Sequence, residues 1–453
     1  MPGNAKKLKT LDRRYLWHPF TQMKEWLASS PLVIERGRGN YLIDTEGRRY
    51  LDGVSSMWAN LHGHRKKEID RAIKTQLDKI AHSTLLGLSN VPSIELARGL
   101  VRIAPKGLKR VFFSDNGSTA VEIALKMSFQ YWARRKGGLR RKKFVSFTNA
   151  YHGDTLGAMG VGEIDVFVSR YRPLLFKTFR SPYPYCYRCA TKKTYPACSI
   201  ACLERLEGIL KKHGEEIAAC IIEPVFEGAS GMVVAPKGFL KGVRDITKKY
   251  GVLLIADEVA AGFGRTGRMF ACDTEGVAPD LLCLAKGLTA GYMPLAATLA
   301  TEDIFNAFLG DFNEHKAFYH GHTYTGNPLG CAAALASLQV FEKEQVLKNL
   351  KPKIRLLKTL LEKFRELKHA GDIRQTGLVA AVEVVRDKGS KARFNPALRI
   401  GHRVAMEART HGLIIRPLGD TIVIMPPLSI TEKEMRTIVD VVFRCIETIT
   451  GRK

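Results

Sequence analysis

The sequence lacks any run of about eighteen or more uncharged apolar residues, the length that a membrane-crossing helix requires. Its first twenty residues are basic but contain no apolar segment ahead of a small-residue cleavage site, as a secretory signal would. Nine cysteines are an odd number, and without such a signal they indicate reduced thiols rather than a disulfide framework. We therefore expect a cytoplasmic protein that does not enter a membrane.

Acidic residues are scarce relative to basic ones, with 44 Asp and Glu against 71 Lys and Arg and a formal charge of +27. Such an excess favours anionic partners by long-range attraction. The basic residues are nevertheless spread along the chain, with no zinc-finger spacing and no strip of interleaved basic and aromatic residues. We interpret them as a solvated surface and expect no nucleic-acid partner.

The rest of the composition is that of an ordinary globular protein, with 45% hydrophobic and 25% charged residues. A chain of 453 residues exceeds the length over which one core keeps growing, which favours a large unit and a smaller one. From residue 111 to 300, short apolar runs alternate with helical patterns, as in a parallel sheet covered by helices on both faces. The strand candidates are 111–114, 144–147, 219–222, 252–256, 281–285 and 296–300.

After about residue 335 the pattern changes to that of a smaller α+β unit. It contains a long charged helix at 351–367, strand-like segments at 378–385 and 421–425, and a helix near 400–411. The N-terminal segment includes the hairpin-like YLIDTEGRRYLD and is expected to pack with this unit. We predict an N-terminal segment over residues 1–65, a large domain over 66–335 and a C-terminal small domain over 336–453.

Two charged residues follow neighbouring strand candidates. Asp257 ends the segment LLIAD, and Lys286 follows LLCLA. Because ligands bind outside the carboxyl ends of parallel strands, we expect both side chains at one site. A lysine can form an imine with the aldehyde of pyridoxal 5′-phosphate, while a carboxylate keeps the pyridine nitrogen protonated, so that the ring withdraws electrons. The pair predicts a site for this cofactor, in which a desolvated Lys286 also acts as nucleophile and base.

The segment SDNGSTA predicts a place for the cofactor's phosphate, because a strand runs into a glycine turn that begins a helix. Backbone N–H groups there, with the hydroxyls of Ser118 and Thr119, would meet the dianion. Tyr151 follows the strand candidate at 144–147, at the same edge as Gly117, where its ring could stack on the pyridine. Each feature has an ordinary alternative, since such turns are common helix caps and a Tyr-His pair after a strand is common in cores.

Several motifs, in one order along the chain, resemble the signature blocks of class III aminotransferases. They are GSTAVEIALK, YHGDT, LLIADEVAAGFGRTGRMFACDTEGVAPDLLCLAKGL and GHTYTGNPLGCAAA. The resemblance extends from Trp17 to the C-terminal helix. It implies an α/β protein of fold type I, with a large domain built on a mainly parallel seven-stranded sheet and a smaller α+β domain. It also implies a homodimer in which each active site is completed by the neighbouring subunit.

Within that class, WHPFTQM, YHGDTLGAM, FGRTGRMFAC and RPLGD are similar to segments of the 8-amino-7-oxononanoate aminotransferase family of biotin synthesis. This implies transfer of an amino group to the ketone of 8-amino-7-oxononanoate, which gives 7,8-diaminononanoate. The alternative is another class III ω-aminotransferase, of the ornithine, acetylornithine or 4-aminobutyrate type, because these share the lysine, the aspartate and the phosphate turn. A basic binding protein that reuses an inactive aminotransferase scaffold is disfavoured, because Lys286, Asp257 and Gly117-Ser118 are all present. WHPFTQM together with RPLGD favours the biotin enzyme.

The resemblance assigns roles to individual residues. Lys286 corresponds to the lysine that binds the cofactor, Asp257 to the partner of the pyridine nitrogen and Tyr151 to the stacking ring. Further cofactor and substrate contacts are implied for Gly117, Ser118, Gly321, His322, Thr323 and Arg416. Thr323 is implied to reach the phosphate bound by the partner subunit. Arg416 is implied to receive the substrate carboxylate, for which a planar guanidinium fork is suited.

Arg265, Asp154 and Glu223 have less specific assignments. The resemblance places Arg265 and Asp154 along the substrate pocket and Glu223 at the edge of the cofactor, and charged groups with perturbed pKa values gather at such sites. The alternatives are a surface ion pair for Arg265 and a plain strand end for Glu223.

Three substrate-pocket residues depart from the branch of the family that uses S-adenosylmethionine as amino donor. Phe20 replaces a tyrosine, Met57 the first of two adjacent tryptophans and His322 a proline, whereas Trp58 keeps the second tryptophan. These changes resemble the branch thought to use lysine. With one phenol and one indole fewer, the pocket has less aromatic surface for a sulfonium cation. The sequence leaves both donors open.

Four cysteines lie close together, as CxxC and CxxxC pairs in PYPYCYRCATKKTYPACSIAC. Thiolates at Cys186, Cys189, Cys198 and Cys202 are suitable ligands for structural zinc. Similar family members carry variable loops here, so ordinary free thiols are the favoured interpretation and we assign no metal site.

Overall fold

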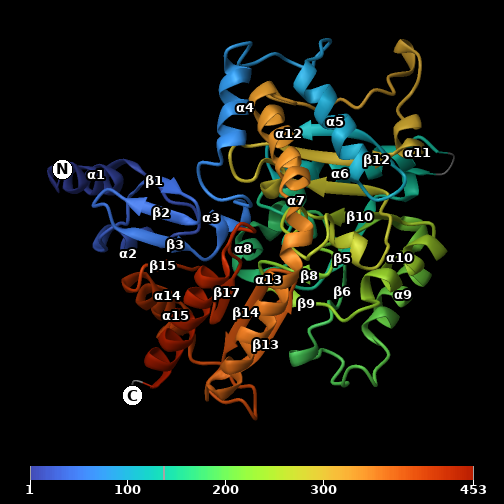
Figure 1. Ribbon diagram of the computed structural model, residues 1–453. Coiled ribbons are helices and arrows are strands. Elements are labelled where there is room, and N and C mark those ends of the chain that lie inside the picture. The colour runs from blue at the N-terminus through green and yellow to red at the C-terminus, as the bar shows by residue number, and fades with distance from the viewer. Residues whose placement is uncertain (1, 136–137, 452–453) are drawn as a thin grey trace.

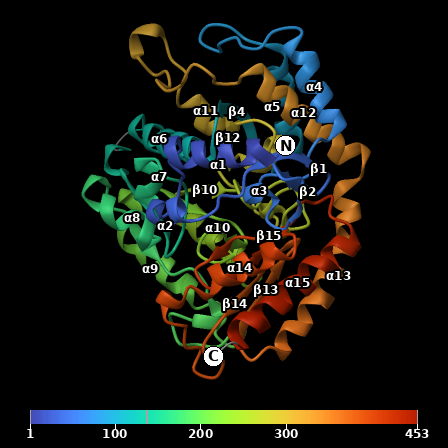
Figure 2. The same ribbon diagram turned by 90° about the vertical axis from the view of Figure 1, so that its left-hand side faces the viewer.

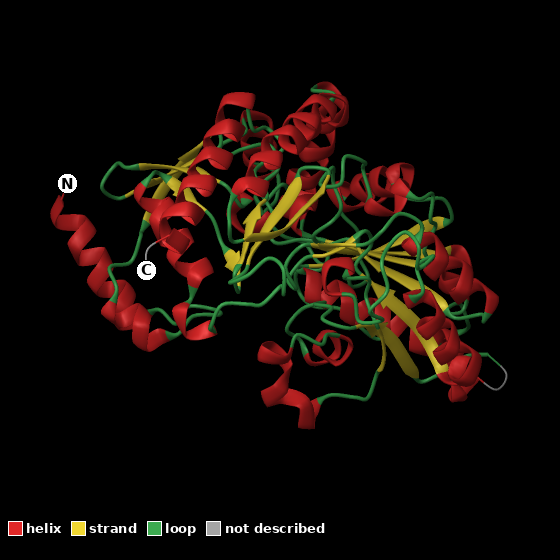
Figure 3. Cartoon of the chain, turned by 90° about the horizontal axis from the view of Figure 1, so that it is seen from below, coloured by secondary structure: helices red, strands yellow, loops and turns green. Residues whose placement is uncertain are grey.

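The computed structural model describes residues 2–135 and 138–451. Figure 1 shows two α/β parts side by side. The larger is built round a central sheet, and the smaller contains the C-terminal helix together with the strands of the N-terminal segment. Figure 3 shows each part with its own strands flanked by helices.

The larger part contains a seven-stranded sheet in the order β4-β12-β11-β10-β7-β5-β6. Its strands are β4 (Leu108–Ser114), β5 (Lys143–Phe147), β6 (Phe179–Ser181), β7 (Ile217–Ile222), β10 (Leu253–Asp257), β11 (Leu281–Leu284) and β12 (Ala296–Thr301). Strands β11, β10, β7, β5 and β6 run parallel, whereas β12 is antiparallel to both β11 and β4. The predicted α/β fold with a mainly parallel seven-stranded sheet is therefore confirmed.

Helices cover both faces of this sheet because its strands are apolar on both sides. In β11, Leu282 and Leu284 belong to one core cluster, and Leu281 and Cys283 belong to a second cluster with α6 (Gly117–Ala133). The first cluster also contains residues of α4 (Lys67–Leu77), α5 (Val91–Ile103), α9 (Cys202–His213), α10 (Phe239–Lys249) and α12 (Pro328–Lys343). Alternation along the strand thus divides the core into two layers.

The smaller part contains a sheet in the order β13-β14-β17-β16 and the helices α13, α14 and α15. A second sheet, β1-β2-β3-β15, joins the N-terminal hairpin to it, because β3 pairs in parallel with β15. These elements are α13 (Val346–Leu361), β13 (Ala370–Thr376), β14 (Val379–Val384), α14 (Ile400–Thr410), β15 (Leu413–Ile414), β16 (Pro417–Leu418), β17 (Thr421–Ile424), α15 (Glu432–Gly451), β1 (Ile34–Arg38), β2 (Tyr41–Asp44) and β3 (Arg49–Asp52). Helix α1 (Pro2–Tyr15) lies across the side that Figure 2 turns toward the viewer.

Short elements complete the chain. They are α2 (Met23–Ala28), α3 (Ser55–Trp58), α7 (Leu156–Val161), α8 (Asp165–Val168), β8 (Phe226–Glu227), β9 (Val233–Val234) and α11 (Glu302–Asn306). No helix in residues 2–135 and 138–451 is long and apolar enough to cross a membrane.

All six strand candidates correspond to strands of the large sheet. The sequence missed β6, whose three residues are too few to show a pattern, and it did not predict that β12 is antiparallel, because an apolar run does not encode direction. The division predicted at residue 335 falls inside α12. The three-part division of the chain stays a prediction.

Candidate active site

A cavity of about 540 Å³ lies where the central strands of the large sheet end, and its size is typical of a small-molecule site. The predicted site residues in its wall are Trp58, Gly117, Ser118, Tyr151, Glu223, Asp257 and Lys286. The fold thus brings together residues from β10, the turn after β11, the start of α6, the end of α3 and two loops.

Asp257 ends β10 and interacts with two hydrogen-bond donors. His152 Nδ1 lies 2.8 Å from Asp257 Oδ2, and the Val259 N–H donates to Oδ1 at 3.1 Å. The side chains of Asp257 and His152 are both buried, so the hydrogen bond between them is shielded from water. These contacts fix the rotation of the carboxylate and leave further lone pairs for a ligand.

Glu223 follows β7 and connects two loops of the cavity wall. One carboxylate oxygen accepts the Tyr151 N–H at 3.1 Å, and the other accepts the Gly228 N–H at 2.9 Å. Burial raises the pKa of this carboxyl to about 7. Glu223 therefore does more than end a strand, because it positions the backbone of Tyr151.

Lys286 begins a short 3-10 turn (Lys286–Thr289) directly after β11. Its φ of 42° lies in the left-handed region, which residues with a Cβ rarely adopt and which is enriched at functional sites. Burial lowers the pKa of its ammonium group, although Asp257 and Glu223 oppose the shift. Its Nζ lies 5.0 Å from the ring centre of Trp58. A lowered pKa makes the neutral amine, which is the nucleophile and the base, available at lower pH.

The N-terminus of α6 offers backbone donors to the cavity. Asn116 caps the helix by accepting the Thr119 N–H at 3.0 Å, and the N–H groups of Gly117 and Ser118 in the first turn have no helical acceptor. A Cβ at Gly117 would lie 2.6 Å from Val259 Cγ1, so only glycine fits. The expectation for the Thr119 hydroxyl needs correction, because it donates to Asn116 O at 2.8 Å within the cap.

The loop after β5 places Tyr151 and Asp154 beside that helix. Tyr151 Oη donates to Asp154 Oδ2 at 2.9 Å, and the Asp154 N–H donates to Ser118 Oγ at 3.1 Å. Burial and the charge of Asp154 raise the pKa of Tyr151. Gly153 has a φ of 123°, and a Cβ there would lie 2.0 Å from Ser118 Oγ. The loop can therefore approach α6 only with glycine at this position.

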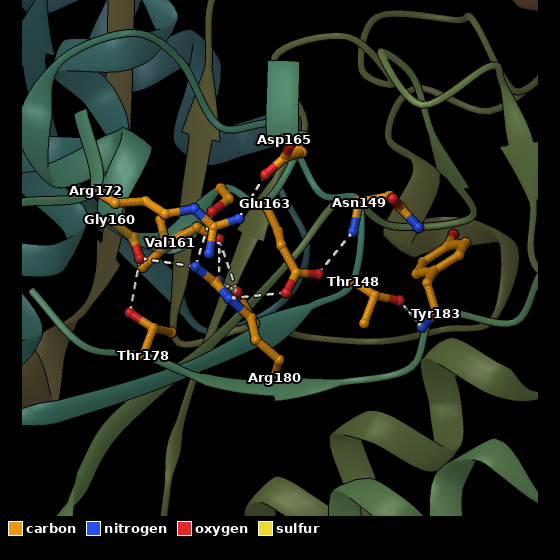
Figure 4. Close-up of polar contacts among 12 residues, drawn as sticks. Thr148, Asn149, Gly160, Val161, Glu163, Asp165, Arg172, Thr178, Arg180 and Tyr183 are labelled. Carbon is orange, nitrogen blue, oxygen red and sulfur yellow. Dashed lines mark hydrogen bonds and ion pairs between the residues drawn. The ribbon is translucent and has the colours of Figure 1, made fainter. Parts of the chain in front are cut away.

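Figure 4 shows the scaffold that supports this loop. Arg180, in β6, donates to the carbonyl oxygens of residues 160–162 at 2.7 to 3.0 Å. Glu163 accepts the Asn149 N–H at 3.2 Å and lies 3.8 Å from Arg180 Nε. The two ends of the segment that contains Tyr151 are thus connected, which limits the positions that its ring can adopt.

Trp58 ends α3, a turn in which every residue from Ser55 to Trp58 has φ between 44° and 71°. Left-handed backbone costs about 1–2 kcal/mol for each residue with a side chain. The buried carboxylate of Asp52 stabilises the turn by accepting the Ser56 N–H and hydroxyl, both at 2.8 Å. The strain is localised where the chain presents Trp58 to the cavity.

Arg265 lies behind Trp58 and does not line the cavity. Its guanidinium is almost completely buried and donates to the carbonyl oxygens of Pro426 at 2.7 Å, Asn60 at 3.0 Å and Trp58 at 3.2 Å. Burial lowers its pKa to about 9. A surface ion pair is therefore wrong for Arg265, and its predicted contact with substrate stays a prediction.

Arg416 and Met57 meet outside the cavity. Arg416 is exposed, and its Nη1 lies 3.5 Å from Met57 Sδ. Since Met57 precedes Trp58 in α3, the exposed guanidinium is connected to the cavity wall by one strained turn.

Phe20 approaches the site through another aromatic side chain. Its ring centre lies 5.1 Å from that of Phe167 in α8, which lies 5.8 Å from that of Tyr151. Sequence reasoning gave no role to Phe167 or to His152. For His152 the available signal was its place beside Tyr151, whereas no motif marks Phe167.

Gly321, His322 and Thr323 lie outside the cavity, in the segment between α11 and α12. Gly321 and Thr323 are exposed, and His322 Nε2 lies 3.8 Å from Asp115 Oδ1, a residue of the cavity wall. Within one chain, therefore, Thr323 does not reach the place where the other residues predicted to bind the cofactor meet.

Comparison with known proteins identifies the class. The family model of class-III aminotransferases matches residues 23–446, and the chain belongs to this family of pyridoxal-phosphate-dependent enzymes. It is 56% identical over 99% of both chains to the adenosylmethionine-8-amino-7-oxononanoate aminotransferase of Geobacter sulfurreducens. The solved structure of the same-named enzyme of Methanocaldococcus jannaschii superposes with a TM-score of 0.93 at 49% identity, covering 98% of this chain and 99% of that one. An ω-transaminase of Pseudomonas jessenii in complex with PMP gives 0.94 at 33% identity over 98% of each chain.

Proposed function

We propose that this chain transfers an amino group to the ketone of 8-amino-7-oxononanoate and so makes 7,8-diaminononanoate for biotin synthesis. The observation that carries the proposal is the meeting of Lys286, Asp257 and the α6 N-terminus in one cavity, in a chain whose relatives at 50–56% identity bear the name of this activity. The names of these relatives favour it over the ornithine, acetylornithine and 4-aminobutyrate alternatives.

Pyridoxal 5′-phosphate fits the donor set of the cavity. An amine, a carboxylate, a helix N-terminus and an aromatic ring are available for its aldehyde, pyridine nitrogen, phosphate and ring face. His152 Nε2 adds a buried polar atom that has no hydrogen-bond partner among the described residues. When bound, the cofactor supplies an aldehyde that takes up the amino group and a ring that withdraws electrons.

The chain's own residues perform the remaining work. Lys286 Nζ anchors the cofactor and moves a proton, which its lowered pKa favours. Asp257, oriented by His152 and Val259, keeps the pyridine nitrogen protonated by charge complementarity. The ring of Tyr151 covers the cofactor, and the hydrogen bond to Asp154 fixes its hydroxyl.

Arg416 receives the substrate carboxylate at the outer end of the site. Its exposed guanidinium offers two parallel donors and lies beside Met57, which precedes Trp58 in the cavity wall. Phe20, Asp154 and Arg265 remain proposed substrate contacts.

Two amino donors remain in competition. The names of the relatives include adenosylmethionine, whereas Phe20, Met57 and His322 resemble the branch thought to use lysine. To decide, the aldehyde-form enzyme is mixed with each donor, and conversion to the amine form is followed by absorbance. Conversion by S-adenosylmethionine alone excludes lysine.

Two chains form a homodimer with shared active sites. Exposed apolar side chains on two segments support this proposal. One segment leads into α5, and the other contains Thr323. These side chains include Leu86, Leu88, Val91, Tyr319 and Tyr324. A dimer that buries them would bring Thr323 to the neighbour's cofactor phosphate.

Mixed dimers test the sharing. Lys286→Ala and Thr323→Glu chains, each inactive alone, are unfolded together and refolded, which gives one intact site in each hybrid. Activity should return to about a quarter of wild type if subunits reassort randomly, while Thr323→Ser remains active as a control. No recovery would contradict shared sites.

The proposed reaction is tested by incubating purified enzyme with 8-amino-7-oxononanoate and each donor, and measuring 7,8-diaminononanoate by mass spectrometry. Ornithine, acetylornithine and 4-aminobutyrate with 2-oxoglutarate serve as controls. If no donor gives product while one of the control amines reacts with 2-oxoglutarate, the chain is another type of class III aminotransferase.

A further inference from the structure

Residues 182–202 form a segment between β6 and α9 whose two ends pack against the hydrophobic core, whereas its middle does not; it lies among the green loops at the lower edge of Figure 1. From 186 to 200 no side chain is buried, and the regular structure there is one 3-10 turn, Cys186–Arg188. The backbone hydrogen bonds are local, as from the Cys198 N–H to Thr194 O at 2.8 Å. A segment with so little core needs another constraint, which in small folds is a disulfide or a metal ion.

The four cysteines of this segment line a single small cavity. Cys186, Cys189, Cys198 and Cys202 all contribute to its wall, and it holds about 20 Å³, the room of one water-sized group. Cys186 begins the 3-10 turn and Cys189 follows it, whereas Cys198 lies in the loop before α9 and Cys202 begins that helix. All four are free thiols, so the chain folds round a common point without joining them.

Cys189 has a polar neighbour beside its sulfur, because Thr191 Oγ1 lies 3.1 Å from Sγ. A hydroxyl that donates to a thiolate helps to orient it and to balance its charge, as the outer contacts of metal ligands do.

We propose that Cys186, Cys189, Cys198 and Cys202 bind one structural zinc ion. Four thiolates with no carboxylate among the residues that line the cavity match the tetrahedral sites that zinc prefers, and this reverses the preference for ordinary free thiols. No group of three or more His, Cys, Asp and Glu side chains in the described ranges is already arranged to hold a metal. The sulfurs therefore turn inward when the ion binds, and each thiol releases its proton to solvent.

The ion has a structural consequence beyond its own segment. Arg188, between the two CxxC cysteines, donates from Nε to Glu383 Oε1 in β14 at 2.8 Å, and Tyr185 Oη also donates to Glu383. Lys391 Nζ donates to Tyr187 O at 2.8 Å. The segment thus connects the large part to the small one, and a bound zinc ion would stabilise the conformation in which these contacts form. The site is separate from the cavity that contains Lys286.

Metal analysis of the full-length holoenzyme, purified without chelator, tests the proposal. We expect about one zinc ion per chain. The variants Cys186→Ser/Cys189→Ser and Cys198→Ser/Cys202→Ser should each lose it, whereas Cys445→Ala, a buried cysteine elsewhere, keeps it. Replacement by cobalt should give the charge-transfer and ligand-field bands of a thiolate site in wild type and in Cys445→Ala, and in neither double variant.

Measurements of stability test the zinc site independently of the proposed transamination. Chelation should lower the melting temperature and speed proteolytic cleavage within residues 186–200, and added zinc should reverse both. Sub-stoichiometric zinc that added zinc does not raise, disulfides among the four cysteines, or zinc retained in both double variants would each overturn the site. None of these results depends on whether 8-amino-7-oxononanoate is the substrate.

Discussion

Nδ1 of His152 lies 2.8 Å from Oδ2 of Asp257, and both side chains are buried in the wall of the same cavity. A carboxylate at a strand end can rotate, and the electrostatic effect of Asp257 on a pyridine nitrogen depends on where its oxygens point. His152 fixes that rotation from the side of β5, and Val259 fixes it from the chain that follows β10. The histidine is therefore a positioning residue for the aspartate.

Replacing His152 by alanine should weaken cofactor binding and lower kcat without unfolding the chain. The hydrogen bond to a charged group is worth about 1.5–3 kcal/mol, so we expect a combined loss of about 10- to 150-fold. His152→Asn is the matched control, because its amide can donate from a similar position and should recover part of the loss. Titration with cofactor measures the affinity, and kcat is measured at saturating cofactor. Equal losses in His152→Ala and His152→Asn would argue against a role for the hydrogen bond that His152 donates to Asp257.

Lys286→Ala should abolish transamination and remove the visible absorbance band of the covalently bound cofactor. Because burial disfavours the charged amine, its removal should leave the melting temperature of the cofactor-free protein equal or higher. Lys286→Arg is the control for charge, since it keeps a cation but cannot bind an aldehyde, and it should be as inactive. Turnover by the arginine variant would show that charge alone suffices.

Glu223 should make stability depend on pH. Its pKa rises from an ordinary 4.5 to about 7 on folding, so the unfolded chain loses this proton first and the contribution of Glu223 to stability falls as pH increases from 4.5 to 7. The difference corresponds to about 3 kcal/mol. In urea titrations of cofactor-free protein, Glu223→Gln should therefore gain on wild type by about this amount between pH 4 and pH 8. A pH-independent difference would contradict the raised pKa.

Arg416→Ala should raise the KM of the keto acid about 10- to 150-fold, because a charged donor pair worth about 1.5–3 kcal/mol is lost. The exposed side chain contacts Met57 alone among the hydrogen-bond partners found in the described residues, so the melting temperature should not change. Arg416→Lys keeps the charge but loses the planar fork and should recover only part of the affinity. Steady-state kinetics with varied keto acid is the measurement, and an unchanged KM would remove the assigned role.

Arg265→Lys should lower the free energy of unfolding by at least about 2 kcal/mol, since a lysine cannot satisfy three buried carbonyl oxygens spread across one fork. The same change should lower kcat through the displaced Trp58 turn. Chemical denaturation and steady-state kinetics together distinguish support of the Trp58 turn from direct contact with substrate. A raised KM with unchanged stability would indicate that Arg265 contacts substrate directly.

Residues at strand ends were predictable from the sequence because the pattern around them is local. Asp257 and Lys286 follow apolar runs, and parallel strands end at one edge, so their meeting in one cavity was expected. Arg265 was not predictable in the same way. Its three acceptors come from two segments, 58–60 and 426, that each lie more than 150 residues from Arg265 along the chain. Nothing in GFGRTGR shows that a charge would be buried there.

The sequence by itself determined the class of fold, the two charged strand ends, the glycine turn and the family, because each depends on residues near one another in the chain. Only the tertiary structure decided the partners of those residues. It placed His152 against Asp257 and buried Arg265, which sequence patterns allow at a surface, where it donates to the backbone of Trp58. It also left Thr323 outside the cavity of its own chain and placed four cysteines around one small cavity. These contacts join segments distant in sequence, and burial decides their energies, which a linear pattern does not contain.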